Sequence, residues 1–370
     1  MEDSIYFVWL QQALGFGSNK LPKIFSKVKS IEEFYHSGLS FWNSLEIFNT
    51  RELAALSKNL KDSEEIHDKC SKLGYNIIPY SSDKFPNILK HIPNPPCVLY
   101  VNGQSSVLQN KCISIVGSRE ASMYGVQMAH DLAKDLSNAG LTIVSGCAFG
   151  IDSAAHRGAI SAKGTTIGVV ACGIDYPYLV KNASIREQIS NFGALISEYP
   201  PGHPIRKFNF PTRNRIISGL SFSTVVIEAR ERSGAIITAN IAAEQGRDVF
   251  VVPVKFDSPL SKGINSLIED GVKVITCAND ILKGSFNYKI DKIHIKKQSN
   301  NQKLTGEIPE EFRPILNAIG NEKIQINDLK KKVNIPIRDL LISLTKMELL
   351  GLVVQLPGKF YKISIEKNKY

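Results

Sequence analysis

The sequence predicts an α/β protein whose main domain is an extended Rossmann-like, doubly wound and mostly parallel sheet. Short apolar runs, many of them β-branched, alternate with segments of helical periodicity at residues 112–116, 141–145, 165–171, 194–199, 223–228 and 248–254. These runs are apolar almost throughout, which is typical of strands that helices cover on both faces. The first two end in glycine-bearing turns, as expected for the carboxyl ends of parallel strands that face a ligand.

Two flanking segments precede this core, which spans residues 106–282. Residues 1–80 have helical periodicity and predict a small helical domain. Its segment Gly15–Lys20 could be a helix-hairpin-helix turn that touches phosphate, or a glycine turn that joins packed helices. Residues 81–105 are rich in proline and predict an extended connecting arm, because proline interrupts a continuous helix.

Two further segments follow the core. Residues 283–307 are polar, basic and without periodicity, and therefore predict a flexible linker. Residues 308–370 contain three helical patterns and two β-like runs, which predict a winged helix. Its third helix carries Arg338 and Lys346 against Asp339 and Glu348, so contact with a protein is at least as plausible as contact with the major groove of DNA.

The composition is that of a soluble globular protein. Of 370 residues, 43% are hydrophobic and 22% charged, and no apolar run is long enough to span a membrane. The acidic opening lacks the basic residues of a signal peptide, so we expect a cytoplasmic protein. The six cysteines are scattered singly, which predicts no zinc or other metal site and fits a reducing compartment.

The net charge of +10 supports nucleic-acid binding only weakly, because most of the surplus lies after residue 282. The arginines are more informative, since nine of the twelve lie in the core, where guanidinium groups suit phosphate. Gly117, Ser118 and Arg119 end the first core strand, and Gly146 and Gly150 follow the second. We expect these two strand ends to face one anionic ligand, with Asp152 capping the next helix.

A third segment alternates cations with aromatic rings, a composition suited to a phosphate backbone with bases beside it. Pro204 and Pro211 predict an irregular loop here. We expect Phe210 to be the exposed ring and assign the core position to Phe208. The candidate DNA-binding residues of this segment are Lys207, Phe210, Arg213, Asn214 and Arg215.

No catalytic triad, metal set or cofactor fingerprint stands out. The glycines after the first strand lack the G-x-G-x-x-G spacing, so we expect no nicotinamide or flavin cofactor. His156, four residues after Asp152, could form an acid–base pair with it, although a packing role is more consistent with its surroundings. We therefore expect a binding protein rather than an enzyme. The alternative is a nucleotide-binding enzyme of the phosphoribohydrolase type, but residues 218–228 lack its glycine cluster before Glu228.

In its motifs the chain resembles the DNA-processing protein A family, also called Smf, of bacterial natural transformation. The motifs include Val116-Gly-Ser-Arg119, Ser145-Gly-Cys-Ala-Phe-Gly-Ile-Asp152, Phe210-Pro-Thr-Arg-Asn-Arg-Ile216, Ser233-Gly234 and Gly263-Ile-Asn265. The chain departs from the family at Tyr178-Leu179 and at Val252-Pro-Val254, where the family has Tyr-Pro and Val-Pro-Gly.

The resemblance implies a sterile-alpha-motif-like N-terminal domain, a Rossmann core that dimerises, and a C-terminal winged helix. It also implies a protein that binds and protects incoming single-stranded DNA and loads the RecA recombinase onto it. By position, the family's DNA pocket would fall on Arg119, Lys207 and Phe210, with Phe210 contacting a base.

Overall fold

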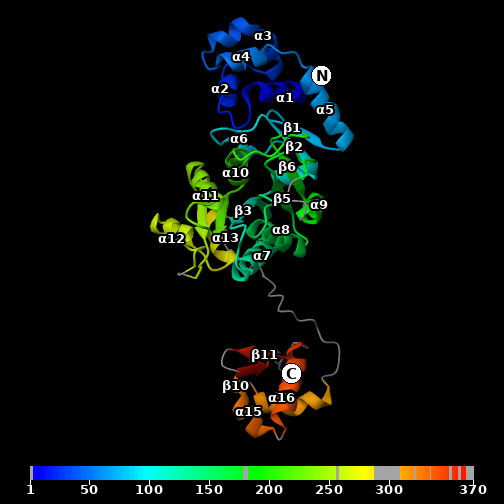
Figure 1. Cartoon of the computed structure of the whole chain (residues 1–370), viewed down its shortest axis with the longest axis vertical. Coiled ribbons are helices and arrows are strands. Elements are labelled where there is room, and N and C mark those ends of the chain that lie inside the picture. The colour runs from blue at the N-terminus through cyan, green and yellow to red at the C-terminus, as the bar shows by residue number, and fades with distance from the viewer. Residues whose placement is uncertain are drawn as a thin grey trace. The chain divides into compact units, whose positions relative to one another are not determined.

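The computed structural model describes residues 3–177, 182–255, 258–286, 309–320, 322–333, 335–349, 352–356 and 360–363. The chain divides into two compact units, Met1–Ile295 and Lys296–Tyr370 (Figure 1). Among the described residues, none of the helices combines the length and apolar character needed to cross a membrane. The predicted linker lies mostly outside the described residues, because helix α13 ends at Phe286 and the description resumes at residue 309.

The first unit begins with a small bundle of five helices: α1 (Asp3–Leu14), α2 (Leu21–Phe25), α3 (Ile31–Ser44), α4 (Thr50–Leu56) and α5 (Lys61–Leu73). Local capping sets several of their ends. Asn49 and Glu52 form a capping box at the start of α4, and Gly74 closes α5 in the left-handed region at φ 71°. Aromatic side chains led by Trp9 and Trp42 fill the interior, which continues onto the nearest strands of the sheet.

The sheet has nine strands in the order β1-β2-β6-β5-β4-β3-β7-β8-β9. All neighbouring pairs from β6 to β9 in this order are parallel, whereas β1 and β2 are added antiparallel at one edge. The strands are β1 (Asn76–Pro79), β2 (Val98–Gly103), β3 (Cys112–Gly117), β4 (Thr142–Ser145), β5 (Thr166–Val169), β6 (Ala194–Ser197), β7 (Ser223–Ile227), β8 (Asp248–Val251) and β9 (Lys273–Val274).

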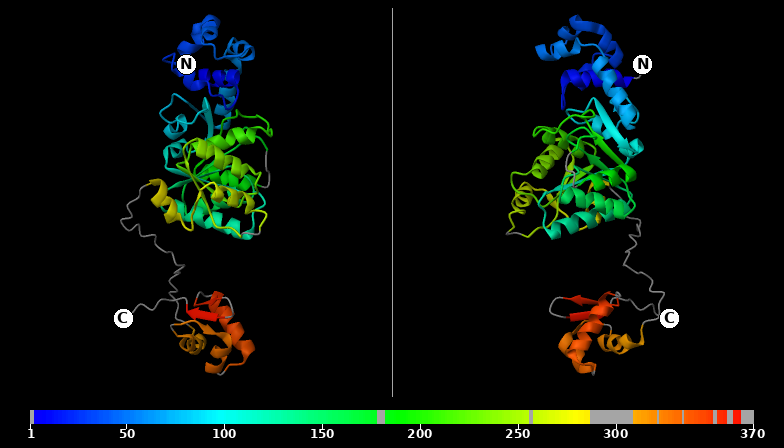
Figure 2. Two further views of the ribbon diagram at one scale, coloured as in Figure 1. Left: turned by 90° about the vertical axis from the view of Figure 1, so that its left-hand side faces the viewer. Right: turned by 45° about the vertical axis from the view of Figure 1, so that its right-hand side comes forward.

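Helices cover both faces of this sheet (Figures 1 and 2). One face packs against α6 (Asn87–Lys90), α10 (Asn209–Gly219), α11 (Gly234–Glu244) and α12 (Lys262–Glu269). The other packs against α7 (Met123–Asn138), α8 (Ile151–Ser161) and α13 (Ala278–Phe286). Helix α9 (Ala183–Phe192) packs beside β6 and α8. The predicted doubly wound, mostly parallel fold is therefore confirmed.

Part of the proline-rich arm belongs to the sheet, because Val98–Gly103 forms β2, which pairs with β6 through Tyr100 and Ser197. One local expectation was wrong. The segment around Phe210 is helical rather than an irregular loop. Helix α10 starts at Asn209 and holds Pro211 in its first turn, where the missing N–H of proline costs no hydrogen bond.

The second unit is a winged helix, as predicted. It contains the 3₁₀ turn η3 (Glu310–Phe312), helices α14 (Arg313–Ile319), α15 (Ile326–Lys332) and α16 (Ile337–Leu349), and strands β10 (Ile324–Gln325), β11 (Val353–Leu356) and β12 (Phe360–Ile363). The strands pair antiparallel in the order β10-β12-β11. Leu329, Leu340 and Met347 are among the side chains that form its core.

Candidate nucleic-acid interface

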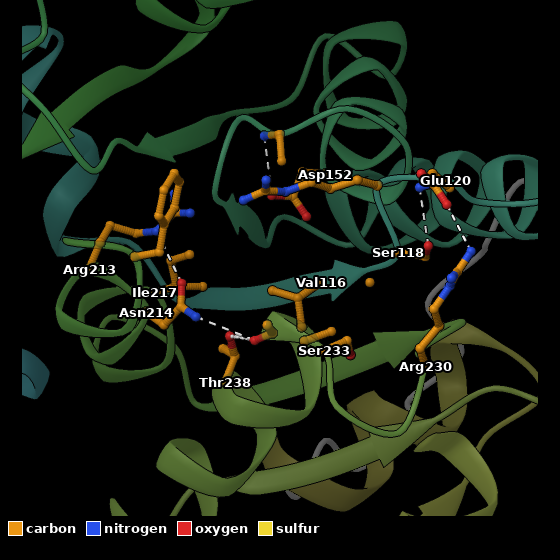
Figure 3. Close-up of a pocket in the computed structure, with 16 residues that line it drawn as sticks. Val116, Ser118, Glu120, Asp152, Arg213, Asn214, Ile217, Arg230, Ser233 and Thr238 are labelled. Carbon is orange, nitrogen blue, oxygen red and sulfur yellow. Dashed lines mark hydrogen bonds and ion pairs between the residues drawn. The ribbon is translucent and has the colours of Figure 1, made fainter. Parts of the chain in front are cut away.

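A pocket of about 340 Å³ lies where the direction of winding of the sheet reverses. The chain moves from β3 to β4, β5 and β6 on one side, and then crosses to β7 and β8 on the other. The carboxyl ends of β3 and β7 therefore lie side by side with loops that diverge from them, which is the usual place for a ligand in such sheets. The pocket lies at this point (Figure 3).

Three glycines allow the backbone to close tightly around the pocket. A Cβ on Gly117 would lie 1.9 Å from the carbonyl oxygen of Ile227, and one on Gly150 would lie 2.3 Å from that of Ser118. A Cβ on Gly146 would lie 2.5 Å from Nη1 of Arg213. Of the three, Gly117 itself lines the pocket. Gly146 and Gly150 hold the surrounding loops in place, so their strong sequence signal reflects backbone packing.

Arg119 and Phe210 form one wall of the pocket. The Arg119 guanidinium lies 5.1 Å from the centre of the Phe210 ring, which is within cation–π distance. Arg119 is exposed, and Phe210 is half-buried. This wall therefore places an exposed, flexible cation beside a half-buried aromatic ring.

Arg213 lies at the floor of the pocket, where most of its side chain is buried. It is 6% exposed, and its Nη1 donates hydrogen bonds to the carbonyl oxygens of Gly146, at 2.7 Å, and Val169. The neighbouring Asn214 donates from Nδ2 to the carbonyl of Gly234 at 3.3 Å. These bonds tie α10 to the turn after β4, to β5 and to the start of α11, and they place a fixed positive charge at the pocket floor.

The start of α11 adds a donor-rich edge that sequence reasoning missed. Ser233 precedes the helix with extended backbone, and its buried hydroxyl has no hydrogen-bond partner. Ser233 and Gly234 both line the pocket, so the positive end of the helix dipole is directed at a ligand there. The pair Ser233-Gly234 before an apolar helix was the available signal, but only the fold shows that this helix starts at the pocket.

An ion pair crosses the mouth of the pocket (Figure 3). Nη2 of Arg230, after β7, lies 2.8 Å from Oε2 of Glu120, after β3. Both side chains are largely exposed, so solvent screens this pair and an anionic ligand can compete with it. The pocket therefore combines three guanidinium groups with a helix N-terminus and an aromatic ring. Arg119 is exposed, Arg230 is held in an exchangeable ion pair, and Arg213 is largely buried.

Comparison with known proteins identifies the family. The family model for DNA recombination-mediator protein A matches residues 76–285, and that for the DprA winged helix domain matches residues 304–359. A protein named Smf from Synechocystis is 31% identical over 98% of both chains. The chain belongs to the DprA/Smf family. DNA processing protein DprA of Bacillus subtilis is 43% identical over 57% of this chain and 71% of its own.

Solved structures of DprA proteins share the fold. DprA from Streptococcus pneumoniae aligns with a TM-score of 0.59 and 31% identity, over 77% of this chain and 98% of its own. The Helicobacter pylori protein, whose structure is described as showing a single-stranded DNA binding mode, aligns with a TM-score of 0.52 and 28% identity over 56% of this chain and 94% of its own.

Within this DprA/Smf chain, the other cations proposed for DNA occupy different places. Lys207 is exposed just before α10 and does not line the pocket. Arg215 is 3% exposed, pairs with Glu198 and lines a second cavity. The expectation that Phe208 is the core ring and Phe210 the exposed one was wrong, because Phe208 is 60% exposed, whereas Phe210 is half-buried in the pocket wall.

The remaining titratable candidates have structural partners. Asp152 does not cap α8 as expected but accepts hydrogen bonds from the backbone N–H groups of Gly146, at 3.1 Å, and Ala148, at 3.3 Å. Burial raises the pKa of its carboxyl group, and the nearby Arg213 opposes this shift. His156 is fully buried and hydrogen-bonds through Nδ1 to the Thr166 hydroxyl at 2.7 Å.

Glu228, the carboxylate that the enzyme alternative requires, faces away from the pocket lining. Its carboxylate is buried and accepts hydrogen bonds from the backbone N–H of Ser122, at 2.8 Å, and from the Ser122 hydroxyl. These bonds hold the start of α7 against the end of β7. Glu228 is not among the residues that line the pocket.

Proposed function

We propose that the pocket between β3 and β7 binds single-stranded DNA. The observation that carries this proposal is the Arg119 guanidinium stacked on the Phe210 ring at the reversal point of the sheet. Sequence-independent strand binding needs a cation for phosphate and a ring for a base, and both are present in one wall. The strand-binding mode described for the Helicobacter pylori relative supports the same reading.

The proposed site residues divide into two roles. Ser118, Arg119, Lys207 and Phe210 contact DNA, with Lys207 meeting phosphate outside the pocket. Gly117 lines the pocket and lets the end of β3 pack closely against Ile227 of β7 and Ile151 of α8. The other proposed residues hold this surface in shape through the contacts described above: Gly146, Gly150, Arg213 and Asn214.

In the cell, we propose that this protein protects incoming single strands during natural transformation and loads RecA onto them. Family membership supports this role. We further propose that it acts in the cytoplasm as a homodimer that associates through its core, and that it is a binding protein without catalytic activity. Light scattering on the purified chain tests the dimer, and a monomer at micromolar concentration contradicts it.

Strand exchange by RecA tests the loading function. Single-stranded DNA is coated with single-strand-binding protein, and RecA-dependent exchange is measured with and without this protein. We expect exchange to accelerate with the wild type and not with Arg119→Ala. If the wild type binds single strands but does not accelerate exchange, RecA loading is refuted. A separate incubation with purine nucleoside monophosphates tests the enzyme alternative, which release of free base would favour.

A further inference from the structure

A second cavity, of about 540 Å³, lies between the N-terminal helical bundle and the core. Four segments line it: the loop after α1, the arm before β2, the first turns of α10 and the last turn of α11. The loop contains the glycine turn Gly15–Lys20, whose role the sequence left open. The N–H of Gly17 donates to Oε1 of Glu198 at 3.3 Å, so this loop is fixed to the core and shapes the cavity.

Two polar side chains that line this cavity have buried atoms without a hydrogen-bond partner. Nε and Nη1 of Arg215 are donors without acceptors, although Nη2 is bonded to Glu198. Oε1 of Gln245 is an acceptor without a donor, and Nε2 of the same side chain donates to the carbonyl oxygen of Arg215 at 3.0 Å. An unpaired buried donor and an unpaired buried acceptor are both costly, and a ligand that carries both kinds of group would satisfy them.

The charges around the cavity favour a neutral ligand group. The positive charge of Arg215 is already balanced by Glu198, and Glu244 adds a negative charge to the lining. The carboxyl end of α11, where the helix dipole is negative, and the first turns of α10, where it is positive, both line the cavity, so the helix dipoles give no net preference for phosphate. Its other lining groups include the amides of Asn19 and Asn94 and the ring of Phe16.

Helix α10 connects this cavity to the first pocket. Phe210, Arg213, Asn214 and Ile217 are spaced as one helical face and line the first pocket. Pro211, Thr212 and Arg215 lie on the opposite face and line the second cavity. A strand that leaves the first pocket across the amino-terminal turn of α10 therefore meets the second cavity next.

We propose that the second cavity binds a nucleobase of the same strand whose backbone is held at the first pocket. This inference rests on the proposed strand-binding function. A nucleobase is neutral and flat and presents both acceptors and donors on one edge. Its acceptors could pair with the unpaired donors of Arg215, and its donors with the unpaired acceptor of Gln245. The cavity volume is in the range of about 300–1,000 Å³ that holds small organic groups.

The experiment compares two strands on the full chain by fluorescence anisotropy. One is oligo(dT), and the other has the same length and backbone but no bases. Gln245→Ala removes the free acceptor, Asn19→Trp fills the cavity from the loop, and Gln104→Ala is the matched control on an exposed side chain. We expect Gln245→Ala to weaken oligo(dT) binding by about fivefold, and Asn19→Trp at least as much, with unchanged affinity for the abasic strand.

Each outcome separates the two proposals. Equal loss on both strands indicates damage to the first pocket or to the fold, and unchanged oligo(dT) binding in both variants overturns the nucleobase site. Photocrosslinking with 4-thiothymidine oligonucleotides gives a direct location, because crosslinks should map to residues 16–19 or 241–245 as well as to the Phe210 region. Crosslinks confined to the Phe210 region overturn the inference. Failure of the wild type to bind any strand refutes the proposed function instead.

Discussion

The structure separates the arginines and lysines near the pocket by whether they can reach a phosphate, and this separation gives a quantitative prediction. Arg119 and Lys207 are exposed, whereas Arg213 is buried and bonded to backbone carbonyl groups. Each phosphate contact to a single strand contributes about 0.7 to the log–log slope of affinity against salt. Arg119→Ala and Lys207→Ala should therefore each lower that slope by about 0.7.

This change is measurable over an ordinary range of salt. Between about 50 and 200 mM, the loss of affinity should be roughly 2.6-fold smaller for each variant than for the wild type. Fluorescence anisotropy with a labelled oligo(dT) strand gives the slope, and Lys58→Ala, an exposed cation of the helical bundle, is the matched control. An unchanged slope in both Arg119→Ala and Lys207→Ala, with both proteins folded, would show that the phosphate path lies elsewhere.

Three further predictions follow from individual contacts. Phe210→Ala should weaken strand binding by about 1–3 kcal/mol and leave the salt slope unchanged, because stacking releases no counterions. Fluorescence anisotropy at several salt concentrations measures the affinity and the slope, and a lower slope would contradict a base contact. Glu198→Gln leaves Arg215 buried without its counter-charge and should lower the free energy of unfolding by about 3–5 kcal/mol. Glu120→Gln breaks an exposed pair and should lower it by less than about 1 kcal/mol, so similar losses for the two variants in denaturant unfolding would refute the argument. Burial lowers the pKa of His156 to about 3 in the folded protein, whereas this histidine becomes protonated near pH 6.5 in the unfolded chain. The free energy of unfolding should therefore fall by about 2 kcal/mol between high pH and pH 5 because of this residue, and denaturant unfolding of His156→Gln should lack that part of the pH dependence.

The sequence predicted the parallel core well because its strands are buried on both faces. Runs such as Ile113–Val116 are apolar except for one buried serine, and glycine marks the end of this strand. Strand β2 was missed because Pro95 and Pro96 precede it and because β6, the partner that joins it to the parallel sheet, lies about a hundred residues away. Pairing across such a separation is a tertiary contact that local pattern does not encode.

The site was predicted in part for a related reason. The stretch from Arg213 to Arg215 looks like one basic cluster in the sequence, but on a helix these two residues point in different directions. Recognising the helix required accepting Pro211 in its first turn. Ser233 was missed because an unpartnered hydroxyl and a helix dipole become visible only when the end of β7 is placed beside β3.

The ends of the sheet determine how a second copy can associate. Within the described residues, one edge is β1, four residues long and closed by Pro79, and the other is β9, which has two residues. Short edges and proline prevent continuous pairing with a strand from another chain. A homodimer of this protein would therefore join through side-chain surfaces on its helices and loops, and the sheets of the two copies would remain separate.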